Sequence, residues 1–208
     1  MLTTFKTEQE KFWAGSFGDE YTARNAQAKI VSSNIAFFAK IFSLTHGISS
    51  IIEFGANIGL NIHALKTLVP GTDISALEIN QTALEELKKI DHLKTYEGSI
   101  LDFNVDYQRD FVFTKALLIH IDPSMLKQAY DILYRTSKRY ICLAEFYNPN
   151  PVDVVYRGHA EKLFKRDFAG EMLDLYHDLR LVDYGFTYHR DVNFPQGDVH
   201  WFLLEKKG

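Results

Sequence analysis

Two features of the sequence have the residue types and the spacing for binding a nucleoside. The first is a glycine-containing loop, residues 53–59 (EFGANIG), and the second is Glu78 at the end of the next apolar run. Gly55 and Gly59 let the backbone approach a ligand without a Cβ collision, and Asn57 tolerates the left-handed conformation. A carboxylate such as that of Glu78 accepts two hydrogen bonds from a ribose diol. Together they predict a site for a ribose-containing cofactor.

The spacing of the loop argues against a nicotinamide or flavin cofactor. A dinucleotide fingerprint needs glycines at positions 55, 57 and 60, but position 57 is Asn and position 60 is Leu. A nucleotide-sugar dehydrogenase is therefore the least favoured function.

The loop of residues 53–59 and Glu78 can form one site only if the fold brings the ends of their strands to the same edge of a sheet. The hydrophobic pattern predicts such a fold. Short apolar runs alternate with helical periodicity from residue 47 onward, which is typical of a parallel sheet covered on both faces. Strands are predicted at residues 50–54, 73–79, 95–96, 111–114 and 140–144, and an antiparallel pair at 181–188 and 199–204. We expect an α/β, Rossmann-like fold: a seven-stranded, mostly parallel sheet with an antiparallel last strand.

Helical periodicity also predicts the parts outside the sheet. A helix is expected over residues 60–68, another after an N-cap at Asn80, and a late one over residues 159–177. Residues 1–46 are predicted to form a helical extension, whose aromatic residues could close over the cofactor as a lid. Residues 47–208 would form the cofactor-binding domain, and no linker separates the two.

Composition excludes several classes of protein. The 208 residues include 23 Lys and Arg against 27 Asp and Glu, a formal charge of -4, and a single cysteine. This charge argues against a dedicated nucleic-acid binder, and one cysteine cannot form an internal disulfide. No stretch approaches the roughly 18 uncharged apolar residues of a membrane span, and residues 1–6 lack a signal-peptide core. We expect a soluble cytoplasmic protein, of undetermined oligomeric state, that binds a small molecule.

The motifs resemble those of the class I S-adenosylmethionine (SAM) dependent methyltransferases over residues 47–208. The resemblance rests on residues 53–59, Glu78, residues 98–100 and residues 111–123. It implies SAM as cofactor, with adenine held by the loop after the third strand; Ser99 stands there where an aspartate is commoner. The resemblance assigns cofactor contacts to Gly55, Asn57, Gly59, Glu78, Ser99 and Ile100, and the candidate cofactor residues also include Glu53, Ile79 and Lys115. Tyr21 and Arg24, three apart on a predicted helix, share a face and could reach the cofactor's carboxylate.

A closer resemblance is to the small methyltransferases associated with pseudaminic acid biosynthesis in bacteria. It is carried by residues 12–25 (FWAGSFGDEYTARN), 118–121 (LIHI), 156–159 (YRGH), 165–171 (KRDFAGE) and 183–186 (DYGF). This resemblance implies a sugar or a sugar-derived acid as the methyl acceptor, without identifying the reaction.

Methyl transfer to a hydroxyl benefits from a general base, and two residues at the predicted ligand edge could serve. His120 follows the fourth strand and Glu145 ends the fifth. The alternative for His120 is a structural role at the start of the next helix, and for Glu145 a capped loop.

The segment before the late helix could bind an acidic acceptor. Tyr156, Arg157, His159 and Arg166 are the candidates, because two guanidinium groups can clamp a carboxylate or a phosphate. The alternative is a solvated helix face. His189, Asp198 and His200 have too loose a spacing for a metal site, so none is expected.

The leading hypothesis is a SAM-dependent methyltransferase that acts on an oxygen or nitrogen of a bacterial surface-sugar precursor in the nonulosonic (pseudaminic) acid pathway. One alternative keeps the cofactor but methylates a protein side chain or a small amine. Another is a non-catalytic module that binds SAM or serves as a scaffold.

Overall fold

The computed structural model describes residues 5–24 and 28–207, without the side chains of residues 28 and 29. Residues 1–4, 25–27 and 208 lie outside this description. The predicted extension 1–46 is therefore described only in part, and of residues 1–6, which lack a signal-peptide core, only residues 5 and 6 are described. Asn25, the last residue of the segment 12–25, lies outside the described residues.

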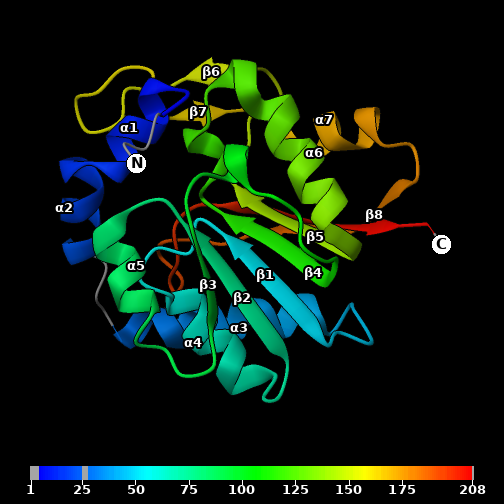
Figure 1. Cartoon of the computed structure of the whole chain (residues 1–208). Helices are drawn as coiled ribbons and strands as arrows, with labels where there is room; N and C mark the ends of the chain where they lie inside the picture. The colour runs from blue at the N-terminus through cyan, green and yellow to red at the C-terminus, as the bar shows by residue number, and fades with distance from the viewer. Residues whose placement is uncertain (1–4, 25–27, 208) are drawn as a thin grey trace.

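The centre of the molecule is a twisted seven-stranded sheet (Figure 1). Its strand order is β3-β2-β1-β4-β5-β9-β8, in which β9 runs antiparallel to both of its neighbours. The predicted fold class is confirmed. The strands are β1 (Ser50–Phe54), β2 (Asp73–Glu78), β3 (Lys94–Glu97), β4 (Arg109–Lys115), β5 (Ser137–Glu145), β8 (Leu179–Phe186) and β9 (His200–Lys206).

Helices cover both faces of the sheet, because the central strands bury side chains on both sides. One apolar core forms against α3 (Ala28–Phe42), α4 (Leu60–Leu68) and α5 (Gln81–Leu87). The other forms against α6 (Leu126–Thr136) and α7 (Phe168–Leu175). Although it belongs to the predicted extension, α3 packs into the core against α4.

Two short helices, α1 (Glu8–Ala14) and α2 (Ser16–Arg24), lie beyond the edge of the sheet at which the parallel strands end (Figure 1). Three 3-10 turns lie at the same edge or near it: η1 (Ile100–Asp102), η2 (Leu118–His120) and η3 (Pro123–Met125). No helix within the described part of the chain combines the length and the apolar character that crossing a membrane requires.

The predicted helix over residues 159–177 is wrong in its first half. Helix α7 begins only at Phe168, where Asp167 caps it by accepting a hydrogen bond from the backbone N–H of Gly170 at 2.8 Å. Within the predicted range, Glu161 has a positive φ angle of 56°, which a helix does not accommodate. Arg157, just before that range, also has a positive φ angle, of 50°. The chain instead forms a small hairpin of β6 (Val152–Asp153) and β7 (Phe164–Lys165).

Candidate functional site

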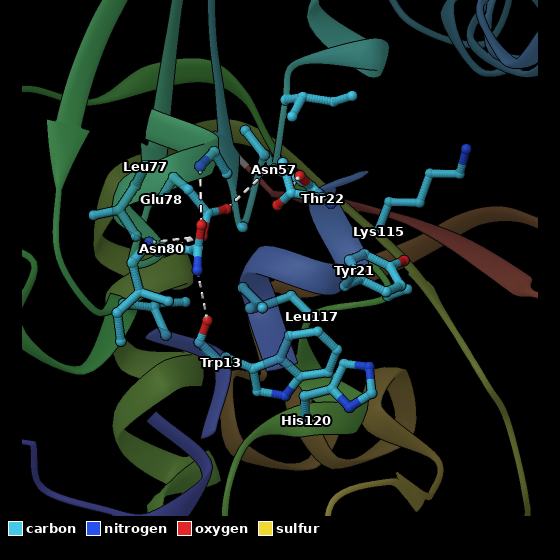
Figure 2. A pocket seen from close by; sticks show the side chains of 18 of the residues that line it. Trp13, Tyr21, Thr22, Asn57, Leu77, Glu78, Asn80, Lys115, Leu117 and His120 are labelled. Atoms are coloured by element: carbon cyan, nitrogen blue, oxygen red, sulfur yellow. Dashed lines mark hydrogen bonds between the residues drawn. The ribbon is translucent and has the colours of Figure 1, made fainter. Parts of the chain in front are cut away.

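A cavity of about 340 Å³ lies at the carboxyl edge of the sheet. Its walls come from the loop after β1, the ends of β2, β3 and β4, and helices α1, α2 and α3 (Figure 2). The volume falls within the range of roughly 300 to 1,000 Å³ that is usual for small-molecule sites. The fold therefore places the cavity where open α/β sheets usually bind a ligand.

The loop after β1 approaches the cavity because its backbone adopts left-handed conformations. Gly55 and Asn57 have φ angles of 76° and 49°, and both line the cavity. A Cβ on Gly55 would lie 2.8 Å from the Cδ1 atom of Leu117. Gly59 has φ 79° and is the N-cap of α4, where a Cβ would meet Ile90 at 2.6 Å. Gly59 thus serves helix packing, and the cavity lining skips it.

Glu78 is buried at the tip of β2 and lines the cavity. Its Oε2 accepts a hydrogen bond from the backbone N–H of Asn57 at 2.7 Å, and its Oε1 accepts from Ile79 and Asn80 at 2.9 and 2.8 Å. Burial raises the pKa of this carboxyl, and the backbone donors oppose that rise. The donors hold the carboxylate in one orientation toward the cavity (Figure 2).

Ser99 and Ile100 border the cavity beside the end of β3. The Ser99 hydroxyl accepts a hydrogen bond from the backbone N–H of Leu101 at 3.0 Å, which caps the turn η1. One lone pair of the Ser99 hydroxyl is therefore occupied by Leu101. At this position the loop presents a hydroxyl to the cavity instead of a carboxylate.

Lys115 ends β4 and lines the cavity, whereas Glu53 lies behind it in the sheet. The Lys115 ammonium donates to Oδ1 of Asn34 at 2.6 Å, and burial lowers its pKa to about 8. Glu53 accepts a hydrogen bond from Asn61 at 2.6 Å, and burial raises its pKa to about 8. Lys115 therefore faces the cavity, and Glu53 supports the cavity wall through Asn61.

His120 lines the cavity in the turn η2, with its ring centroid 4.3 Å from that of Trp13 (Figure 2). Its Nδ1 lies 2.7 Å from the backbone carbonyl oxygen of Lys162. Because a carbonyl oxygen only accepts, Nδ1 carries the proton and Nε2 keeps the lone pair. Burial lowers the pKa of His120 to about 4, so the ring is neutral near pH 7.

Glu145 is buried and is not among the described residues that line the cavity. Its Oε1 accepts hydrogen bonds from the Thr114 hydroxyl at 2.8 Å and from the backbone of Leu117 and Leu118 at 3.2 and 3.1 Å; its Oε2 accepts from Ile119 at 3.3 Å. Burial raises its pKa to about 7. Through these hydrogen bonds Glu145 stabilises the loop on which His120 lies.

The candidate substrate residues also lie outside the described cavity lining. Tyr156 packs against His120 with ring centroids 5.3 Å apart, and His159 packs edge-on against both Phe12 and Phe17, which stack on each other. Arg157 is exposed, and Arg166 is already paired with Glu171 at 2.7 Å. The segment therefore backs the aromatic side of α1 and α2, and an Arg157–Arg166 clamp would first have to release Arg166 from Glu171.

Two residues of α2 were expected to reach the cofactor. Tyr21 lines the cavity. Arg24 is exposed beside Glu20, 3.5 Å from its carboxylate, and is not among the described lining residues.

Several lining residues were missed by sequence reasoning. Gln9 and Glu10 are buried polar residues of α1, and Asn34 and Asn61 position Lys115. Glu10 has a sequence signal, because Thr7 and Glu10 have the spacing of a capping box, which the structure contains. Its burial depends on the docking of α1 and has no local signal.

Comparison with known proteins identifies the fold. No protein-family model and no curated protein matches the sequence. Solved structures do match, among them structures of methyltransferases with SAM or SAH bound. The chain has the fold that these methyltransferases share.

Several of these structures span more than nine tenths of the chain, among them the following three. The 1,6-didemethyltoxoflavin-N1-methyltransferase of Burkholderia thailandensis, with its substrate and S-adenosylhomocysteine (SAH) bound, has a TM-score of 0.68 at 10% identity, covering 100% of this chain and 94% of its own. CalS10, an amino pentose methyltransferase from Micromonospora echinaspora with SAM bound, has a TM-score of 0.64 at 8% sequence identity. The match covers 92% of this chain and 97% of CalS10. The magnesium protoporphyrin IX methyltransferase of Synechocystis, with SAH bound, has a TM-score of 0.66 at 12% sequence identity. The match covers 97% of this chain and 100% of the Synechocystis enzyme.

Proposed function

We propose that this protein is a SAM-dependent methyltransferase. The observation that carries the proposal is the buried carboxylate of Glu78, held by backbone donors at the edge of a cavity whose other wall is the loop with Gly55 and Asn57. A carboxylate in this position binds the two hydroxyls of a ribose. The fold shared with SAM- and SAH-bound methyltransferases supports the same cofactor.

The residues present fit such a cofactor. Glu78 would hold the ribose, Ser99 and Ile100 would border the base, and the Lys115 ammonium would face the cofactor's carboxylate. Buried polar atoms of α1 that have no partner among the described residues give the cavity further hydrogen-bonding capacity. When bound, SAM supplies an electrophilic methyl group on a sulfonium.

Helices α1 and α2 are proposed to act as the lid of the site. Trp13 and Tyr21 contribute aromatic rings to the cavity wall, with centroids 5.3 Å apart. Asn80 anchors both helices, because its Nδ2 donates to the carbonyl oxygen of Trp13 at 3.2 Å and to Asp19 at 3.0 Å. A closed lid excludes water and strengthens electrostatic interactions inside the site.

His120 is proposed as the general base. Its neutral ring and fixed tautomer leave the Nε2 lone pair to receive the proton of a hydroxyl acceptor. A neutral amine acceptor could attack first and lose its proton later. Glu145 positions the loop on which His120 lies.

The proposed acceptor is an oxygen or nitrogen of a bacterial surface-sugar precursor of the nonulosonic (pseudaminic) acid pathway. The sequence resemblance to methyltransferases of that pathway supports it, and so does the fold shared with an amino pentose methyltransferase. Modification of a protein side chain or a small amine is the second candidate, because the neighbours' acceptors differ widely in chemistry.

Mass spectrometry tests the acceptor. Purified protein and SAM are incubated with each intermediate of the pathway, and the expected product is one intermediate heavier by a single methyl group. Labelled SAM with a cell lysate, separated into protein and metabolite fractions, is run in parallel. Label in the protein fraction alone would contradict the sugar acceptor and favour the second candidate.

A further inference from the structure

Within the part of the chain that the structure describes, three buried polar atoms of α1 have no hydrogen-bond partner, and all three belong to residues that line the cavity. They are Oε1 of Gln9, Oε1 of Glu10 and Nε1 of Trp13. The side chains of Gln9 and Glu10 are deeply buried, with 6% and 5% of their residue surface exposed. Leaving such atoms unpaired is unfavourable, so they point to a ligand that supplies their partners.

The position of Glu10 along the cavity follows from two anchors of the segment that contains α1. On one side, the Lys6 ammonium donates to the carbonyl oxygen of Leu101 at 2.9 Å, in the turn after Ser99. On the other side, the carbonyl oxygen of Trp13 accepts from Asn80, whose own backbone N–H binds Glu78. Glu10 lies between these anchors, and therefore over the stretch that joins the Ser99 loop to Glu78.

Gln9 points elsewhere. Its amide nitrogen donates to the carbonyl oxygen of Glu161 at 3.0 Å, and the next carbonyl, that of Lys162, accepts from His120. Gln9 thus faces the His120 side of the cavity, and Glu10 is the unpaired acceptor on the Ser99 side.

The orientation of the Glu10 carboxylate is fixed by the capping box. Its Oε2 accepts hydrogen bonds from the backbone N–H groups of Lys6 and Thr7, at 2.5 and 3.0 Å. Oε1 is then the atom left for the cavity, and as a carboxylate oxygen it accepts and cannot donate. A ligand group beside it must therefore be a donor.

We propose that Oε1 of Glu10 accepts a hydrogen bond from the 6-amino group of the cofactor's adenine, so that the lid reads the base. This inference rests on the proposed SAM-dependent function. It explains how the site recognises the amino group although Ser99 supplies no carboxylate and already binds Leu101. It also couples base recognition to lid closure, because Glu10 belongs to α1.

The test is a calorimetric comparison of SAH with S-inosylhomocysteine, in which an oxygen replaces the 6-amino group. The wild-type protein is expected to prefer SAH by about 10- to 100-fold, the effect of one charge-assisted hydrogen bond. In Glu10→Gln the backbone donors of Lys6 and Thr7 retain the amide oxygen at the Oε2 position, which places the amide nitrogen at Oε1. This donor suits the 6-oxo group, so the preference is expected to vanish or reverse.

Thr7→Ala is the matched control. It removes the other half of the capping box, the 3.1 Å bond from Glu10 N–H to the Thr7 hydroxyl, and leaves the Glu10 carboxylate in place. It should weaken both ligands equally and keep the preference for SAH. Equal wild-type affinity for the two ligands, or an unchanged preference in folded Glu10→Gln, would overturn the inference while leaving SAM binding intact. If the wild type bound neither ligand, the proposed function would fail as well.

Discussion

The carboxylate of Glu78 and the backbone N–H of Asn57 are joined by a hydrogen bond of 2.7 Å. This bond ties the tip of β2 to the loop after β1, so the two walls of the cavity are held together by one side chain. The left-handed conformation of Asn57, with φ 49°, aims its N–H at the carboxylate. The site is therefore organised before any ligand binds, which reduces the ordering that binding requires.

Gly18→Ala should displace the lid. A Cβ at position 18 would lie 1.9 Å from the carbonyl oxygen of Trp13 and 2.7 Å from Nδ2 of Asn80, the pair that anchors α1. Alanine has a higher helix propensity than glycine, so the substitution should not destabilise α2 itself. We expect SAH affinity to fall by about tenfold, equivalent to roughly 1.4 kcal/mol. The fluorescence of Trp13 should shift toward that of an exposed indole, while the buried Trp201 reports an intact core. Unchanged SAH affinity would show that the lid does not depend on this contact.

His120 should give the protein a pH-dependent stability. Its pKa is lowered from 6.5 to about 4 by burial, so the folded state favours the neutral ring. The contribution is present above pH 6.5 and is lost as the pH falls toward 4. The difference in free energy of unfolding between wild type and His120→Gln should therefore shrink as the pH falls from 6.5 to about 4. Urea denaturation of both proteins measures it, since other titrating groups are common to the two. A gap that stays constant with pH contradicts the burial of a neutral His120.

Glu145→Gln should lower stability more than it lowers cofactor binding. The amide nitrogen cannot accept hydrogen bonds, so it faces the donors of Thr114 and the η2 loop without pairing. We expect a loss of about 1 to 3 kcal/mol in the free energy of unfolding, with SAH affinity nearly unchanged. Chemical denaturation and calorimetry check the two expectations. Normal stability combined with complete loss of methyl transfer would instead support Glu145 as the catalytic base.

The fold was predictable from the sequence wherever local patterns decided it. The strand at residues 50–54 and the helix at 60–68 were predicted with the bounds that the structure has, because an apolar run, Gly55 and Gly59 mark them. Asn80 was predicted as an N-cap, and its side chain does accept from Ala83. The helix over 159–177 failed in its first half because Glu161, inside the predicted range, adopts a left-handed conformation that its residue type does not signal.

The site was predictable in its cofactor half and less so in its lid. Gly55 and Asn57 follow β1 and Glu78 ends β2, and the topology brings these strand ends together, so their sequence spacing indicated the cavity. Glu145 shared that spacing, but its carboxylate is occupied by three backbone donors of the neighbouring loop and by the Thr114 hydroxyl of β4. Glu10 was missed because its burial arises from tertiary docking, which no periodicity in residues 5–24 records.

Calorimetric titration with SAH tests the central claim most directly. The account predicts that the wild-type protein binds SAH and that Glu78→Ala loses most of this binding, because the carboxylate that would hold the ribose is gone. Glu97→Ala removes an exposed carboxylate at the end of the adjacent strand β3 and should bind as the wild type does. No heat with SAM or SAH at millimolar concentration, or wild-type affinity in folded Glu78→Ala, would contradict it.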